Sequence, residues 1–88
     1  NKEFKNYDIT IEFLNKILWD YPSSDLAKRA LFTKAYINSN YIQSYTVAKE
    51  LYNQFLSKYP NDDLVPSVKY ELEELDKHND TIQELLNK

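Results

Sequence analysis

The chain of 88 residues repeats part of itself once, and this repeat limits the folds open to it. A Tyr-Pro pair occurs at Tyr21-Pro22 and returns at Tyr59-Pro60, with an offset of 60 − 22 = 38 residues. Other positions keep the same offset: Tyr7 and Tyr45, Leu14 and Tyr52, Ile17 and Phe55, Asp25 and Asp63, Ala30 and Val68, Phe32 and Tyr70. One period that spans two helices and a proline break is typical of stacked helical hairpins.

Apolar spacing predicts helices throughout the chain. Between residues 45 and 60, Ala48, Tyr52 and Phe55 stand at i, i+4 and i+7 and define one apolar face. Pro60 cannot continue a helix, so this helix is expected to end near Lys58. The same reasoning predicts a single all-α domain over residues 1–88, with helices at 7–21, 24–37, 43–58, 63–77 and 80–87.

Turn and capping residues set the expected boundaries. The residues before Tyr7 are mostly polar and are expected to form a frayed lead-in. Asn38-Ser39-Asn40 is a predicted turn, because Asn tolerates left-handed backbone geometry when Gly is not used. The candidate helix caps are Ser23 or Ser24, then Asn61 or Asp62, and finally Asn79 or Asp80, with Gln83 three residues after Asp80 completing a capping box.

Composition excludes several functions. The net charge is −3, which argues against a nucleic-acid partner because phosphate binding needs clustered Lys and Arg. Cys and Gly are both absent, so thiolate metal sites and Gly-rich phosphate loops are excluded. No apolar run is long enough to cross a bilayer, so no membrane insertion by this segment is expected.

The expected core has a close-packed helix at its centre. The buried side of helix 24–37 is predicted to hold small residues, which let a neighbouring helix approach closely. The predicted set is Leu26, Ala27, Ala30, Leu31, Ala35, and Tyr36 or Ile37. Tyr21, Tyr52 and Tyr59 are expected to pack their rings while the hydroxyls stay in water.

No catalytic residue, metal ligand or cofactor site is predicted. His78 is the only histidine, and it is expected at a solvated helix end. An acidic face at Glu71, Glu73, Glu74 and Asp76 has two interpretations: a surface for a basic partner or a cation, or a solvated helix face. The second is favoured, since helical carboxylates without a loop scaffold are poor calcium ligands.

The helix from 45 to 60 resembles the second helix of a tetratricopeptide repeat. In that pattern Ala48 is the small residue, Tyr52 the aromatic, Phe55 the apolar residue and Pro60 the closing proline. The first copy departs from it, with Thr10, Leu14 and Ile17 at the corresponding places, and Ala35 stands where the first helix expects Gly. The resemblance implies a right-handed solenoid of antiparallel hairpins.

The two breaks, YPSSDLAKRALF and YPNDDLVPSVKY, resemble more closely the repeats of bacterial envelope proteins. Two such families are the lipoprotein that assists outer-membrane barrel assembly and the periplasmic coordinator associated with the Tol–Pal system. This resemblance implies a periplasmic or outer-membrane-associated location. A cytosolic repeat adaptor that binds peptide segments of other proteins is the alternative.

The resemblance also implies a non-enzymatic scaffold whose groove binds a protein or peptide partner. The groove-side residues it implies are exposed positions of helices 24–37 and 63–77: Arg29, Phe32, Thr33, Tyr36, Ser67, Tyr70, Glu71 and Glu74. Trp19, outside the repeat match, is a further candidate contact.

The first helix has no preceding hairpin to cover it. Its face of Ile11, Leu14 and Leu18 is therefore expected to be under-covered. Two consequences follow as expectations: the natural protein extends further at its N-terminus, or the chain self-associates through this helix.

Overall fold

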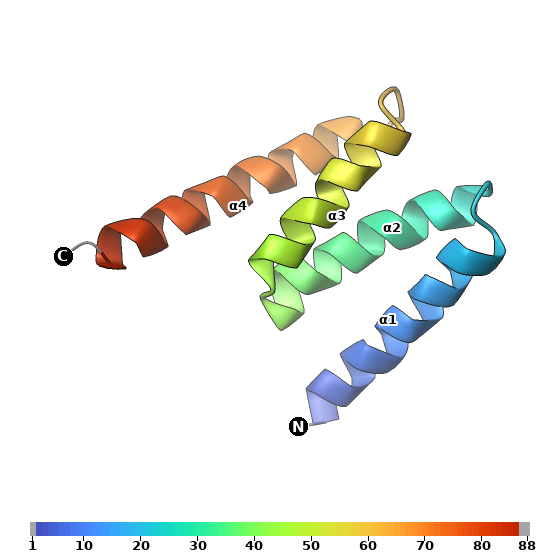
Figure 1. The fold of residues 1–88 in the computed structure, drawn as a ribbon, viewed down its shortest axis with the longest axis horizontal. Coiled ribbons are helices and arrows are strands. Elements are labelled where there is room, and N and C mark those ends of the chain that lie inside the picture. The colour runs from blue at the N-terminus through green and yellow to red at the C-terminus, as the bar shows by residue number, and fades with distance from the viewer. Residues whose placement is uncertain (1, 87–88) are drawn as a thin grey trace.

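The structure, a computed structural model, describes the backbone of residues 2–86 and the side chains of residues 7–77. The helices in this range are α1 (Lys2–Asp20), α2 (Asp25–Ile37), α3 (Tyr45–Lys58) and α4 (Val65–Leu86), with a short π-helix, η1 (Asn38–Ile42), after α2. They zigzag in one layer, each packed on its neighbour in sequence (Figure 1), within extents of 47 × 36 × 14 Å. The prediction of an all-α stack of hairpins is confirmed.

The predicted fifth helix does not exist as a separate element. Helix α4 runs from Val65 to Leu86 without a break, so the capping box expected at Asp80 is not used. A capping box begins a new helix only where the previous one has ended, and neither Gly nor Pro stands nearby to end it. For the same reason α1 already begins at Lys2 and takes in most of the expected lead-in. The side chain of His78 lies outside the described residues.

The turn between α2 and α3 differs from the predicted one. Helix α2 continues into η1, and the left-handed residue is Gln43, at φ 65° and ψ 33°, while Asn38 stays right-handed. The Asn38 Nδ2 donates to the Lys34 carbonyl at 2.8 Å. The Asn38 carbonyl in turn accepts from the Ser44 N–H at 2.8 Å. Asn38 therefore closes the helix through bonds that do not require it to be left-handed.

Gln43→Gly is expected to stabilise the protein by about 0.5–1 kcal/mol. A residue with a Cβ is strained in left-handed backbone geometry, and Gly relieves that strain. Gly also gives the unfolded chain more conformational entropy, which offsets part of the gain. Urea unfolding followed by helical circular dichroism measures the change. Ser39→Gly, in the right-handed η1, should destabilise; if both variants move stability the same way, the account of this turn is wrong.

The main core lies between α2, α3 and α4. Its buried members are Leu31, Ala35, Ala48, Leu51, Tyr52, Phe55, Val68 and Leu75. Ala35, Ala48 and Phe55 are each 0 % exposed, which confirms the close approach of α2 and α3 predicted from the small residues. Leu26 was predicted to be buried, but it is 57 % exposed, because it stands on the outer edge of α2, where no helix covers it.

Helix α1 presents a different face to solvent from the one predicted. Leu14 is buried, and Ile11 and Leu18 pack beside it in a second cluster with residues of α2. Among the described side chains of α1, the large apolar ones that are exposed are Ile9, Phe13 and Trp19, at 65 %, 63 % and 85 %, and Tyr21, just after the helix, is 60 % exposed. The stripe of Ile11, Leu14 and Leu18 thus packs on α2, and the adjacent stripe that contains Phe13 is left uncovered.

Candidate functional site

A groove runs between α2 and α4, with α3 behind it. The two helices run in the same direction (Figure 1), and each packs on α3. Two hollows lie along this α2–α4 groove. One lies between α2 and the loop just before α4, and the other between the η1–α3 junction and the middle of α4.

The first hollow has a volume of about 460 Å³ and contains a charged bridge. Its lining residues are Lys28, Arg29, Phe32, Thr33, Asp62, Asp63 and Leu64. The Lys28 ammonium lies 2.7 Å from Asp62 Oδ2, and Asp62 Oδ1 accepts from the Leu64 N–H at 3.2 Å. Asp62 therefore ties the start of α4 to α2.

Asp62 and Ser24 occupy the same repeat position, and the side chain of each accepts a hydrogen bond from a backbone N–H near the start of a helix. Ser24 Oγ accepts from the Ala27 N–H at 3.2 Å at the start of α2, which confirms the predicted cap. Asp62 accepts instead from the Leu64 N–H, two residues along the chain and just before α4 begins at Val65, so its side chain closes an Asx turn at the entrance to α4. The hydrogen bond from Lys28 lowers the pKa of Asp62, and the Asp62 carboxylate raises the pKa of Lys28.

Asp62→Asn is expected to destabilise the protein at neutral pH and much less at pH 3. A carboxyl whose pKa is lowered by folding stabilises the fold above its unfolded pKa of about 3.9, and this contribution is lost as the pH falls through the folded pKa. The raised pKa of Lys28 adds a contribution that is lost only above about pH 10.4. Melting temperatures of the wild type and of Asp62→Asn, measured between pH 3 and neutral pH, show how the deficit changes. Asp63→Asn, an exposed neighbour, is the control, and an Asp62→Asn deficit independent of pH would contradict the bridge.

Between the hollows, aromatic rings line the groove. Phe32 is half-buried and contacts Tyr36, Tyr52 and Phe55, with ring centroids 6.4, 5.8 and 6.4 Å apart. Tyr52 is fully buried, and among the described residues its hydroxyl has no hydrogen-bond partner. The expectation that this hydroxyl stays in water is therefore wrong. An unpartnered buried hydroxyl costs about 1–3 kcal/mol.

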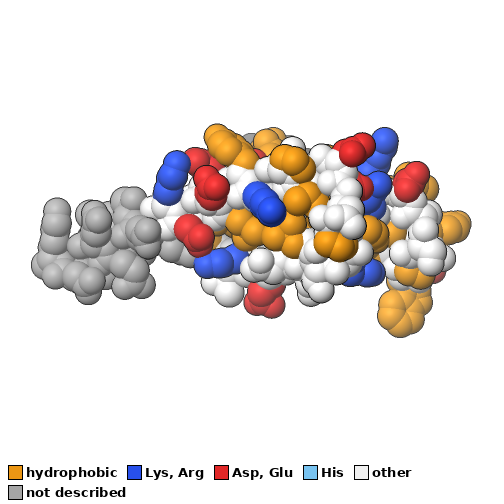
Figure 2. All heavy atoms as spheres, turned by 90° about the horizontal axis from the view of Figure 1, so that it is seen from above, with side chains coloured by type: hydrophobic (Ala, Val, Ile, Leu, Met, Phe, Trp, Pro, Cys, Tyr) orange, Lys and Arg blue, Asp and Glu red, His pale blue; other side chains and the backbone are white. Residues whose placement is uncertain are grey.

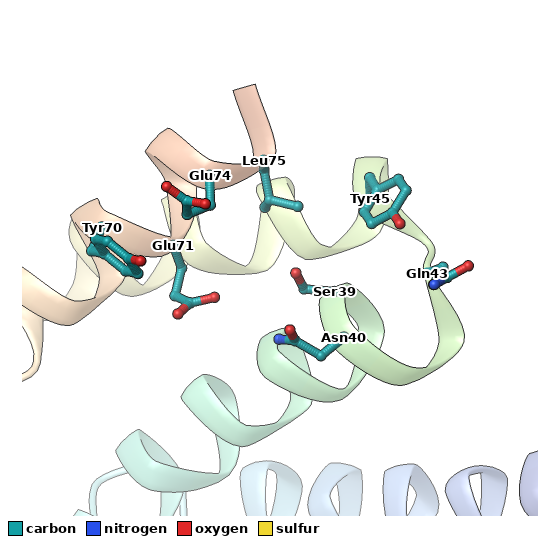
Figure 3. A pocket seen from close by; sticks show the side chains of 8 residues that line it. All are labelled: Ser39, Asn40, Gln43, Tyr45, Tyr70, Glu71, Glu74 and Leu75. Atoms are coloured by element: carbon teal, nitrogen blue, oxygen red, sulfur yellow. The ribbon is translucent and has the colours of Figure 1, made fainter. Parts of the chain in front are cut away.

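The second hollow has a volume of about 380 Å³ and is acidic. Figure 3 shows Glu71 and Glu74 on α4, with Glu71 pointing across the gap toward α2. The full lining is Ser39, Asn40, Gln43, Tyr45, Tyr70, Glu71, Glu74 and Leu75. We call it the acidic hollow, because it has two carboxylates and no Lys or Arg in its lining.

Most predicted site residues lie along the groove. Arg29, Phe32 and Thr33 line the first hollow, and Tyr70, Glu71 and Glu74 line the acidic hollow. Tyr36 and Ser67 line neither, but each continues the helical stripe of its neighbours, one turn along. Trp19 is 85 % exposed on α1 and is not brought together with the others.

Other lining residues were missed by sequence reasoning. Asn40 and Tyr45 come from the junction between α2 and α3, which had been interpreted only as a turn and a helix start. Asp62 was expected as a cap, and its ion pair with Lys28 depends on tertiary packing that the spacing does not encode. The 38-residue offset, which aligns Asp62 with Ser24, was the one sequence signal that pointed to a structural role for Asp62.

Comparison with known proteins gives one match, to part of the chain. Residues 29–62 match the tetratricopeptide repeat. The match begins on α2, takes in η1 and α3, and ends after the second Tyr-Pro pair, so it covers a hairpin of the stack. It supports the resemblance to the tetratricopeptide-repeat family. No curated protein and no solved structure matches the chain.

The tetratricopeptide repeat is a non-catalytic repeat that mediates protein–protein interaction. In the matched segment, α2 is the first helix of the repeat and α3 the second. By the 38-residue offset, α4 takes the place of α2 in the next repeat and α1 that of α3 in the preceding one. The α2–α4 groove thus lies between two successive first helices.

Neither a membrane span nor a metal cluster is found in the part of the chain that the structure describes. Over that range, no helix is both long and apolar enough to cross a bilayer. Nor do three His, Asp or Glu side chains of that range gather in an arrangement that suits a metal ion.

Proposed function

We propose that the chain is a non-catalytic scaffold that holds a segment of a partner protein in the α2–α4 groove. The observation that carries this proposal is the alignment of equivalent residues: Arg29, Phe32, Thr33 and Tyr36 on α2 recur as Ser67, Tyr70, Glu71 and Glu74 on α4. Three residues of each set line one of the two hollows: Arg29, Phe32 and Thr33 the first, and Tyr70, Glu71 and Glu74 the acidic hollow. The residues at equivalent positions differ in chemistry, as Thr33 and Glu71 do, so the α2 side and the α4 side of the groove would make different contacts with a bound segment.

A capture experiment tests the groove. Arg29→Ala with Tyr70→Ala removes one exposed side chain from each wall, and neither belongs to the buried core. We expect this double variant to recover about tenfold less of the proteins that the wild type captures from its source cells. Asn53→Ala with Gln54→Ala changes exposed positions of α3 and should capture as wild type does. Equal capture by both double variants would contradict the proposal.

We also propose that the uncovered face of α1 mediates self-association. Its hollow of about 480 Å³ is lined by Phe13, Lys16, Ile17, Asp20, Tyr21 and Leu26. Figure 2 shows apolar side chains reaching the surface at one end of the described part. By the repeat offset, Phe13 and Ile17 correspond to Leu51 and Phe55, which α3 buries in its own core. A second copy is the occupant proposed for this face.

Sedimentation velocity tests the self-association. Wild type is expected to sediment as a concentration-dependent mixture, and Phe13→Glu is expected to be a monomer, because a charge would have to be buried. Trp19→Glu places the same charge at an 85 % exposed site outside the hollow and should behave as wild type. A wild type that is monomeric at all concentrations would contradict this proposal.

The proposed location is the bacterial envelope, in the periplasm or at the outer membrane. Its support is the resemblance of the two Tyr-Pro breaks to envelope repeats. Fractionation of cells that produce the full natural protein tests this location. Recovery in the cytosol would favour the alternative, a cytosolic adaptor that binds peptide segments.

A further inference from the structure

The layer of helices has two edges, and each is formed by one helix. Figure 1 places α1 along one edge and α4 along the other, with α2 and α3 between them. The 38-residue offset pairs α1 with α3 and α4 with α2. Each edge helix therefore has an inner counterpart that is packed on both sides, and the two can be compared position by position.

The outer face of α4 carries charge where α2 carries apolar side chains. Leu31 and Ala35 of α2 are buried in the main core beside α3. Their equivalents on α4 are Lys69 and Glu73, and both are exposed. Burial of these charges against another helix would be unfavourable unless each found a matched partner. This edge of the layer is therefore unsuited to receive a second copy of the chain.

The outer face of α1 keeps the apolar chemistry of its counterpart. Leu51 and Phe55 of α3 are buried in the main core. Their equivalents on α1 are Phe13 and Ile17. Phe13 is 63 % exposed, and Ile9, one turn earlier, is 65 % exposed. We call the row of Ile9, Phe13 and Ile17 the open stripe, and of the two edges it is the one with the chemistry of a helix–helix contact.

The open stripe is symmetric about Phe13. Ile9 and Ile17 lie four residues before and after it, so an antiparallel copy of α1 sets Phe13 on Phe13 and Ile9 on Ile17. Glu12 and Lys16 lie along one side of the stripe, about one turn apart, and both are exposed. A two-fold axis at Phe13 keeps this side together in both copies, so Lys16 of each copy reaches Glu12 of the other.

We propose that the second copy binds through its own open stripe, with the two α1 helices antiparallel about a two-fold axis at Phe13. This inference rests on the proposed self-association and names the surface that the second copy brings to it. A contact of a stripe with itself closes as a dimer, whereas a contact of α1 with the α4 edge would continue into a filament. The exposed charges of α4 disfavour the filament, and the matched Glu12 and Lys16 favour the dimer.

Cysteine cross-linking tests this arrangement, because the chain has no Cys of its own. A disulfide forms only where two Cα atoms come within about 7 Å. After mild oxidation, a mixture of Ile9→Cys and Ile17→Cys chains is expected to give covalent dimers. Neither of these chains should do so alone, since each position lies about 12 Å from its own copy along the helix axis. Phe13→Cys is expected to cross-link to itself; the mixture retains Phe13 and decides the case if Phe13→Cys weakens association.

Charge reversal beside the stripe is a second test. Lys16→Glu gathers like charges at the contact and is expected to weaken association about tenfold. Lys16→Glu combined with Glu12→Lys restores one charge of each sign on each copy, so association should return to near the wild-type value. Lys69→Glu reverses an equal charge on the α4 edge and should leave association unchanged. Sedimentation velocity at low salt, where charge pairs are least screened, measures all three.

Several results would overturn the inference while the chain still associates. Cross-linking of Ile9→Cys to itself would mean a parallel pair, and cross-linking of Phe13→Cys with Glu73→Cys would mean a head-to-tail stack. Absence of all these products, or no recovery in the double charge variant, would place the contact elsewhere. Products lost in the full natural protein would mean that another segment covers the stripe. A wild type that is monomeric at all concentrations would instead remove the proposed self-association itself.

Discussion

Phe55→Ala is expected to destabilise the protein by about 3–5 kcal/mol, the largest effect of any single truncation proposed here. Phe55 is 0 % exposed and contacts Phe32 on α2 and Tyr59 at the end of α3, with ring centroids 6.4 and 5.1 Å apart. A domain of this size is stabilised by about 4–13 kcal/mol in total. The variant should therefore unfold at a much lower urea concentration, or fail to fold at 37 °C.

The control for Phe55→Ala is another phenylalanine on an equivalent helix. Phe13 is 63 % exposed on α1, so Phe13→Ala should change the free energy of unfolding by less than about 1 kcal/mol. Urea unfolding followed by circular dichroism, at a protein concentration where the chain is monomeric, measures both variants. Similar losses for the two would mean that the core does not lie where the structure places it.

Ala35→Leu is expected to destabilise by about 1–3 kcal/mol or more, even though it adds apolar surface. Ala35 is 0 % exposed and belongs to the same core cluster as Ala48 on α3, which is equally buried. Because both residues are small, the two helices approach closely, and a larger side chain has to push them apart. That displacement would also widen the α2–α4 groove, since α2 forms one of its walls.

Thr33→Leu is the matched control for Ala35→Leu. It introduces the same side chain on the same helix at an exposed position, where Leu has the better helix propensity. We expect its stability to equal or slightly exceed that of wild type. If Ala35→Leu were equally neutral, the close packing of α2 on α3 would be contradicted.

The repeat offset and the apolar spacing predicted the parts of the fold that depend on local chemistry. Ser24 as a cap, the end of α3 at Lys58 and the burial of Phe55 are confirmed, because a hydroxyl cap, a proline and a helical stripe act within a few residues. The same offset aligned Phe32 with Tyr70, and the two line neighbouring hollows of one groove.

The features that were missed depend on which neighbours are present. Leu26 has an apolar side chain but lies at an edge that no helix covers, and Asp80 has a capping side chain but lies in a helix that does not turn. The Tyr52 hydroxyl was expected in water because tyrosines usually keep that group wet. Its burial follows from the packing of α3 against its neighbours, including the edge contact with Phe32 on α2, which spacing along one helix does not encode.

Site-specific photo-crosslinking tests the central claim, that the α2–α4 groove is the face that binds a partner. Benzoylphenylalanine replaces Tyr70 in the groove, Asn53 on the exposed side of α3, or Trp19 on α1, in the full natural protein within its own cells. The account predicts a covalent adduct with a partner protein from position 70 and none from position 53. Adducts from position 53 or 19, without one from position 70, would contradict it.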